Sequence, residues 1–179
     1  CIQWAIRLEL ANRFYPAEFK AWNEASLIKN ADQWLSPHLT GINTLEQLKK
    51  MDLFSALQSL LDWNQQQRLN AILPERIEVP TGSMIRVSYQ SNGPAKLSVR
   101  MQEMFGLSHT PKLCDGKLSL LMDLLSPAHR SLQLTEDLAR FWQGSYKEVQ
   151  KEMKGRYPKH FWPDDPANAK PTTKVKNKM

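Results

Sequence analysis

Apolar residues recur at helical spacing through the first 73 positions of the chain. The clearest example is a stripe of leucines that follows Asp52, namely Leu53, Leu57, Leu60 and Leu61. Such a stripe buries one face of a helix and leaves the other faces in water. Thr44 and Gln47 have the spacing of a capping box, in which each side chain accepts a hydrogen bond from the other residue's backbone amide. We therefore predict a small bundle of short helices over residues 1–73.

From Pro74 onward, apolar and polar residues alternate with a period of two, which is typical of half-buried strands. Five strands are predicted, in the runs ERIEVP, MIRVSYQ, AKLSV, PKLC and KLSLLMDLL. The run RMQEMF, between the third and fourth strands, predicts a helix that ends at Gly106. This order of elements matches an OB-like β-barrel, although a split sheet packed on helices would give a similar pattern.

Helical patterns return after the strands. Asp137 lies at a predicted helix start, where an acidic side chain favours the helix dipole. Ser145 and Glu148 form a second capping-box pattern, and the helix that follows is predicted to end at Gly155.

The stretch GRYPKHFWPDDP, residues 155–166, contains three prolines, which exclude a regular helix. It also contains three large rings, Tyr157, Phe161 and Trp162, which gain nothing from lying in water. We interpret it as an extended structural strap that packs across the folded body. Beyond it Ala, Asn, Lys, Pro and Thr dominate, which is typical of disorder.

These patterns predict an α+β chain in four parts. They are a helical bundle segment at 1–73, an OB-like β domain at 74–130, C-terminal helices with the aromatic and proline strap at 131–166, and a basic disordered tail at 167–179.

The formal net charge of +6 is concentrated near the C-terminus. Residues 154–179 carry seven Lys and Arg side chains against two Asp. A flexible basic segment can bind a polyanion by counterion release, although it can also serve only to keep the chain in solution. We favour the polyanion interpretation.

Motifs for catalysis are missing from the sequence. It contains neither a phosphate-binding GxxxxGK[ST] loop nor a GxGxxG motif, and the four His and two Cys lack the spacing of a metal site. Cys114 falls in a predicted apolar strand and is interpreted as a small core residue. We predict no catalytic residue, no metal and no cofactor in this part of the protein.

No apolar run reaches the roughly 18 residues of a membrane span, and the first residues lack the zones of a signal peptide. We therefore expect a cytoplasmic protein without membrane insertion. Because the chain opens with Cys1 inside an amphipathic pattern, we also expect it to be a piece of a longer protein.

The alternation in the second and third predicted strands places polar side chains on one outer face. Arg86, Lys96 and Arg100 share this face and could bind the backbone of a single-stranded nucleic acid. The same alternation is equally expected for a merely solvated face. Arg156 and Lys159, beside the rings of the strap, are further candidates for contact with nucleic acid.

Four phrases, in this order, resemble the C-terminal region of the HrpB family of bacterial DEAH-box ATP-dependent helicases. They are VPTGSMIRVSY, LSVRMQEMFG, LLSPAHRSLQLTEDLARFW and SYKEVQKEMKGRYPKHFWPDDP. The resemblance is strong over residues 74–172 and looser over the helical part.

The resemblance implies two upstream motor domains that bind and hydrolyse ATP with Mg²⁺, followed by a winged-helix module and a helical bundle. It implies that residues 1–73 are either the end of that bundle or a family-specific helical insertion. The ATP-binding and DEAH residues of the family have no counterpart here, so this chain alone is not expected to hydrolyse ATP. The implied role is to help guide single-stranded nucleic acid, with RNA favoured over DNA. The alternative is a structural module that docks a protein partner or the motor domains without touching nucleic acid.

Overall fold

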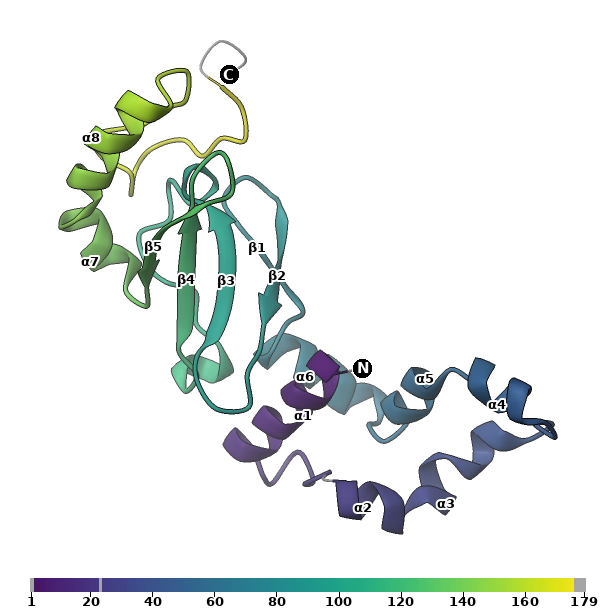
Figure 1. Ribbon diagram of the computed structural model, residues 1–179. Helices are drawn as coiled ribbons and strands as arrows, with labels where there is room; N and C mark the ends of the chain where they lie inside the picture. Colours follow the sequence, from purple (N-terminus) through teal and green to yellow (C-terminus); the bar gives the residue numbers. More distant parts are fainter. Residues whose placement is uncertain (1, 23, 176–179) are drawn as a thin grey trace. The chain divides into compact units, whose positions relative to one another are not determined.

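The computed structural model describes residues 2–22 and 24–175 (Figure 1). Contacts within the chain divide it into two compact units, residues 1–73 and residues 74–179. The first unit is helical, and the second contains the sheet together with the last two helices.

The first unit consists of short helices. They are α1 (Ile2–Phe14), α2 (Glu24–Lys29), α3 (Ala31–Trp34), the 3-10 helix η1 (Ser36–Leu39), α4 (Leu45–Lys50), α5 (Leu53–Gln58) and α6 (Trp63–Ile72). The predicted capping box before α4 is confirmed: the Gln47 amide donates to Thr44 Oγ1 over 3.2 Å, and the Thr44 amide donates to Gln47 Oε1 over 3.1 Å.

The helix predicted to follow Asp52 is in fact two helices, α5 and α6. The break occurs because Asp62 begins a new helix with a capping box of its own. The Gln65 amide donates to Asp62 Oδ1 over 2.8 Å, and the Asp62 amide donates to Gln65 Oε1 over 3.1 Å.

Helices α1 and α6 pack together in the core of this unit. Its buried apolar residues include Trp4, Leu8, Leu10, Ala11, Phe19, Ala56, Leu61, Leu69, Ile72 and Leu73. Arg7 is buried among them, with 2% of its surface exposed. Its Nε donates to the Leu73 carbonyl over 2.6 Å, and one terminal nitrogen donates to Asn70 Oδ1 over 2.5 Å. Arg7 therefore ties α1 to the C-terminal end of α6.

The second unit contains a five-stranded sheet in the order β1-β2-β3-β4-β5. The strands are β1 (Arg76–Glu78), β2 (Met84–Ser88), β3 (Ala95–Arg100), β4 (Leu120–Leu125) and β5 (Ser131–Thr135). Strands β3 and β4 are parallel and the other neighbours are antiparallel. The crossover between the parallel pair contains the 3-10 helices η2 (Met101–Glu103) and η3 (Cys114–Gly116).

The predicted α+β class and the order of helical segment, sheet and C-terminal helices are confirmed, but the assignment of the fourth and fifth strands is wrong. PKLC is not a strand, because Cys114 and Asp115 have φ values of 49° and 55°, and only Leu113 forms an isolated bridge, with Leu118. Cys114 itself is buried, as predicted. The fifth strand is instead β5, which extends the sheet beyond residue 130.

The predicted helix in RMQEMF is only the single turn η2. Among the described strands, β1 and β5 are the two ends of the sheet, and the sheet is not closed into a barrel. The OB-like detail of the prediction is therefore not confirmed.

Helices α7 (Leu138–Gln143) and α8 (Tyr146–Arg156) follow the sheet. Asp137 caps α7 as expected, since its Oδ1 accepts a 2.9 Å hydrogen bond from the Arg140 amide. The predicted capping box at Ser145 is wrong, because Ser145 has helical dihedrals and its side chain makes no capping hydrogen bond. Helix α8 ends at Arg156, one residue later than predicted.

Residues 155 and 156 of the predicted strap belong to α8. The rest of the strap, residues 157–166, runs back from α8 across the end of the sheet (Figure 1). Trp162 is 4% exposed, and the Phe161 ring lies 6.2 Å from the Phe105 ring, edge to face. Tyr146 Oη donates to the Pro163 carbonyl over 2.8 Å, and Gln102 Nε2 donates to the Phe161 carbonyl over 2.9 Å. Side chains of α8 and of the crossover thus hold the strap by its backbone as well as by its rings.

The described part of the tail, residues 167–175, differs from the disorder predicted for 167–179. Thr172 is 7% exposed, and its amide donates to the Gln102 carbonyl over 3.0 Å. Gly106 has φ +86°, and a Cβ built on it would lie 3.1 Å from the Ala169 carbonyl oxygen. The tail therefore passes close to the same segment that holds the strap. The rest of the predicted tail, 176–179, lies outside the described residues.

In the part of the chain that the structure describes, no helix combines the length and the apolar character needed to cross a membrane.

Candidate nucleic-acid interface

The central strands have one buried and one outer face, as the alternation predicted. Val87, Leu97 and Val99 are each at most 2% exposed. The intervening side chains of β2 and β3 lie on the outer face, and they are Arg86, Ser88, Lys96, Ser98 and Arg100. The predicted contacts of these side chains with nucleic acid stay a prediction, but their pairing within the protein separates them into two groups.

Lys96 is engaged by a carboxylate on the neighbouring strand. Its Nζ lies 2.8 Å from Asp123 Oδ2, and the Asp123 side chain is 8% exposed. Ser98 and Ser131 also donate to this carboxylate, over 3.1 and 2.6 Å. Burial by itself would raise the pKa of Asp123, but the hydrogen bonds from Lys96, Ser131 and Ser98 outweigh it and hold the pKa below its usual value. Lys96 thus neutralises a buried charge, and its predicted contact with a phosphate stays a prediction.

Acid is expected to destabilise the second unit through Asp123. Because its pKa is lowered in the fold, its contribution to stability is complete above the unfolded-state pKa of about 3.9 and is lost as the pH falls through the lower folded-state value. Urea unfolding at pH 6 and pH 3 should therefore show a smaller pH-dependent loss in Asp123→Asn than in the unaltered chain. Equal losses in both proteins would contradict this.

Arg100 is engaged in a similar way. Its Nε lies 3.0 Å from Glu103 Oε2, with the two side chains 25% and 7% exposed. The other carboxylate oxygen of Glu103 accepts from Ser83 Oγ over 2.9 Å and from Thr81 Oγ1 over 3.4 Å. Arg100 therefore neutralises a carboxylate that holds the turn between β1 and β2.

Arg86 faces a second arginine across the β1–β2 ladder. Arg76 and Arg86 are directly paired by register, and both are exposed. Arg76 donates to the Met84 carbonyl over 3.1 Å, and no carboxylate forms an ion pair with either arginine among the described residues. Like charges directly opposite one another destabilise a ladder, so the two guanidinium groups are an unfavourable pair for the hairpin itself.

Arg76 was missed in the sequence analysis, although a partial signal was present. Arg76 and Arg86 stand equally far from Thr81, at the centre of the β1–β2 turn. In a tight antiparallel hairpin, residues equally far from the turn lie opposite each other. Counting outward from the PTGS turn, residues 80–83, would however place Arg86 opposite Ile77. The two arginines face each other because the turn has five residues, 79–83.

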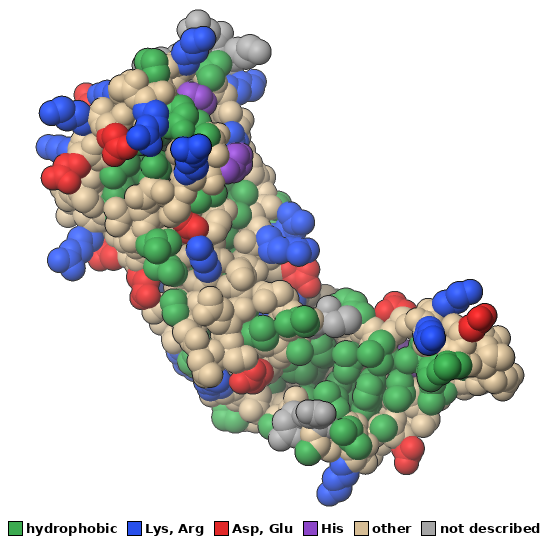
Figure 2. All heavy atoms as spheres, viewed as in Figure 1, with side chains coloured by type: hydrophobic (Ala, Val, Ile, Leu, Met, Phe, Trp, Pro, Cys, Tyr) green, Lys and Arg blue, Asp and Glu red, His purple; other side chains and the backbone are tan. Residues whose placement is uncertain are grey.

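The remaining two candidates do not stand on these strands. Arg156 belongs to the last turn of α8 and lies 3.5 Å from Glu152, with 58% of its side chain exposed. Lys159 is exposed in the strap. Beside it, His160 Nδ1 lies 3.2 Å from Gln102 Oε1, and burial and the charge of Arg100 both lower the pKa of His160. Figure 2 shows Lys and Arg side chains gathered over the part of the second unit that carries α8 and the strap.

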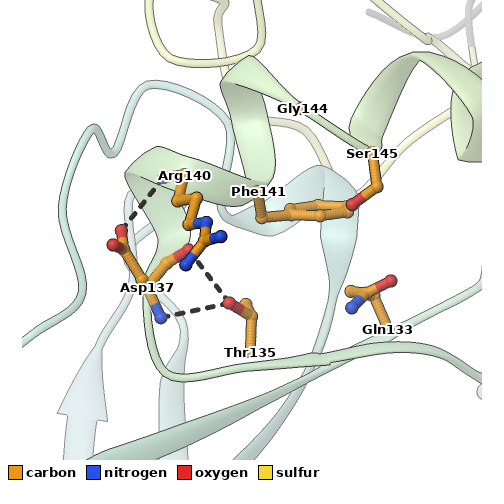
Figure 3. A pocket seen from close by; sticks show the side chains of 7 residues that line it. All are labelled: Gln133, Thr135, Asp137, Arg140, Phe141, Gly144 and Ser145. Atoms are coloured by element: carbon orange, nitrogen blue, oxygen red, sulfur yellow. Dashed lines mark hydrogen bonds between the residues drawn. The ribbon is translucent and has the colours of Figure 1, made fainter.

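A small hollow between β5 and α7 offers no catalytic arrangement (Figure 3). Thr135 Oγ1 accepts from the Asp137 amide over 3.0 Å and donates to the Asp137 carbonyl over 2.9 Å. The Asp137 carboxylate is in turn used to cap α7. These polar groups serve the local backbone. No group of three or more His, Cys, Asp or Glu side chains suited to a metal is present within residues 2–22 and 24–175.

The chain combines a helical unit with a mixed five-stranded sheet and two further helices, and this α+β architecture does not by itself define a function. The chain belongs to the HrpB C-terminal family, described as ATP-dependent helicase C-terminal, which matches residues 34–166. The resemblance found in the sequence is thereby confirmed.

Two kinds of comparison agree with this assignment. The chain is 50% identical over 175 residues to the ATP-dependent RNA helicase HrpB of Escherichia coli K12, covering 97% of this chain and 22% of the relative. It matches the crystal structure of the E. coli DExH-box NTPase HrpB with a TM-score of 0.92 and 50% identity, covering 97% of this chain and 22% of that one.

A second crystal structure, of the Escherichia coli DEAH/RHA helicase HrpB, gives a TM-score of 0.77 at 47% identity over 90% of this chain and 20% of that one. The chain thus spans about a fifth of the length of the proteins it matches.

Proposed function

We propose that this chain helps a helicase of the HrpB type to hold or guide single-stranded RNA. The observation that carries the proposal is the exposed Arg76–Arg86 pair on the outer face of the β1–β2 hairpin. Arginine presents a planar fork of donors that matches a phosphate, and two such forks side by side suit successive phosphates of one strand.

Binding at this pair would follow the sugar-phosphate backbone and would not read bases. The face contributes guanidinium and hydroxyl groups, and its exposed neighbour on β2 is Met84, without a ring on which a base could stack. Affinity should therefore depend on salt more than on base sequence. This is the behaviour that a motor requires of a part that holds a moving strand.

The test is a fluorescence-anisotropy titration of labelled single-stranded RNA at two salt concentrations, with DNA of the same sequence in parallel. Replacing Arg76 and Arg86 by Ala should weaken RNA binding by about 10- to 30-fold at 0.1 M salt and reduce the salt slope by about 1.4, since each lost phosphate contact contributes roughly 0.7. The control variant is Lys49→Ala/Lys50→Ala, which removes the same charge from exposed positions on α4.

Unchanged affinity in the arginine variant, or no RNA binding by the unaltered chain, would overturn the proposal. Equal or tighter binding of DNA would overturn the preference for RNA.

A second candidate function is protein docking, and the first unit favours it. Its described helices expose large apolar side chains, each between 43% and 77% accessible: Ile2, Ile28, Leu45, Leu48, Leu53 and Trp63. Figure 2 shows hydrophobic atoms gathered over this unit. Such exposure marks a surface that another protein covers. Under this alternative the chain docks motor domains of the same helicase or a separate protein partner, and the titration above detects no RNA binding.

For the whole protein, we propose that ATP and Mg²⁺ serve motor domains outside this chain and that the helicase works in the cytoplasm. The E. coli relative is an ATP-dependent RNA helicase, which supports the first point. No ATP-binding motif occurs in these 179 residues.

A further inference from the structure

A basic hollow lies between the β1–β2 turn and the tail, with a volume of about 540 Å³. Its lining consists of Pro80, Thr81, Lys170, Pro171, Thr172, Thr173 and Lys174. These residues come from two segments some ninety positions apart in the sequence. Its size is within the range of sites that hold a nucleotide-sized ligand.

Both walls of the hollow rest on the segment that follows β3. On one side, the buried Glu103 carboxylate accepts from Ser83 and Thr81 and so fixes the β1–β2 turn. On the other side, the Thr172 amide donates to the Gln102 carbonyl. Thr172 Oγ1 also accepts a 3.0 Å hydrogen bond from the Lys174 amide, which sets the course of the backbone at this lysine. The walls are therefore positioned by the fold before any ligand arrives.

The chemistry of the lining is that of an anion site. Lys170 and Lys174 are exposed, and neither forms an ion pair with any residue that the structure describes. The hydroxyls of Thr81 and Thr172 are engaged within the protein, the first with Glu103 and the second with the Lys174 backbone. No carboxylate lines the hollow. The Glu103 side chain, which holds one wall, is 7% exposed and is paired with Arg100. Two ammonium groups with no carboxylate in the lining favour a ligand that carries more than one negative charge.

We propose that this hollow binds the phosphates of a single-stranded nucleic acid, as a second contact point in addition to the Arg76–Arg86 pair. The inference rests on the proposed function. The β1–β2 hairpin connects the two contact points. Its strands carry the arginine pair, and the turn that joins them forms one wall of the hollow. The rings of Pro80 and Pro171 supply apolar surface for a sugar or base between the phosphates.

The experiment uses the same RNA titration with Lys170→Ala/Lys174→Ala, compared with Lys49→Ala/Lys50→Ala as the charge-matched control. We expect the tail variant to bind about 10- to 30-fold more weakly at 0.1 M salt and to lose about 1.4 from the salt slope, while the control changes neither. The thermal midpoint should stay the same, since both lysines are exposed.

Three other outcomes distinguish this inference from the proposal that the chain binds RNA. If the unaltered chain binds RNA and the tail variant binds equally well, the hollow is not a contact and only this inference is overturned. If the unaltered chain binds no RNA, both fail. If a polyglutamate peptide of equal charge competes as well as RNA, and does so only when both lysines are present, the hollow takes acidic protein segments and the inference is overturned.

Discussion

Removal of residues 157–179 is expected to destabilise the second unit by more than about 3 kcal/mol. The deletion takes away Trp162, which is 4% exposed, and burying such a ring contributes about 3–5 kcal/mol by itself. It also uncovers the Phe105 ring and leaves the Tyr146 hydroxyl without the Pro163 carbonyl. In a unit of this size, such a loss corresponds to a fall of roughly 12 °C or more in the melting temperature.

Differential scanning calorimetry of the full chain and of the chain ending at Arg156 measures this effect. Lys159→Ala is the matched control, since it changes the strap at an exposed position and should leave the melting temperature unaltered. Trp162→Ala should reproduce most of the loss caused by the deletion. An unchanged melting temperature in the shortened chain would show that the strap does not support the fold.

Replacing Arg7 by Ala is expected to destabilise the first unit by about 2–4 kcal/mol. The substitution leaves the Leu73 carbonyl, in a residue with no exposed surface, without the 2.6 Å hydrogen bond from Arg7 Nε. Asn70 loses a charged donor as well. An unsatisfied buried acceptor costs about 1–3 kcal/mol, and hydrogen bonds to charged groups are the stronger ones.

Urea unfolding of the whole chain, followed by circular dichroism at 222 nm, measures this loss through the helical signal. Arg13→Ala is the comparison variant: this arginine lies on the same helix but is 44% exposed, so its removal should cost less than about 0.5 kcal/mol. Equal losses in the two variants would mean that burial of Arg7 does not matter.

Local signals in the sequence predicted local structure well. The Thr44–Gln47 cap, the alternation in β2 and β3, and the acidic cap of α7 each depend on residues only a few positions apart, and the structure contains all three. The wrong assignments arose where contacts between residues distant in the sequence, and not the local pattern, decide the structure. PKLC has the composition of a strand, but the chain reverses at Cys114 and Asp115 through left-handed dihedrals. SLQLT completes the sheet because it finds a partner in β4.

In the candidate interface, too, the local pattern did not predict contacts between residues distant in the sequence. Alternation placed Arg86, Lys96 and Arg100 on one face, but it could not show that Asp123 and Glu103 pair with two of them. Asp123 stands on a strand that pairs in parallel with β3 across a long crossover, and neither the partner nor the register of such a pair can be obtained by counting. Even in the β1–β2 hairpin, counting from the PTGS turn misses the register by one residue, because the turn also includes Val79.

The partners of Gln102 in the C-terminal segments are translated well after Gln102 itself. Its amide side chain and carbonyl bond to Phe161 and Thr172, and the neighbouring Phe105 packs on Phe161. A ribosome makes these partners some sixty to seventy residues after Gln102. While the chain is being translated, the sheet can therefore assemble with this end uncovered, and it is closed only when the later residues emerge. The nascent chain then presents an apolar surface to chaperones for that interval.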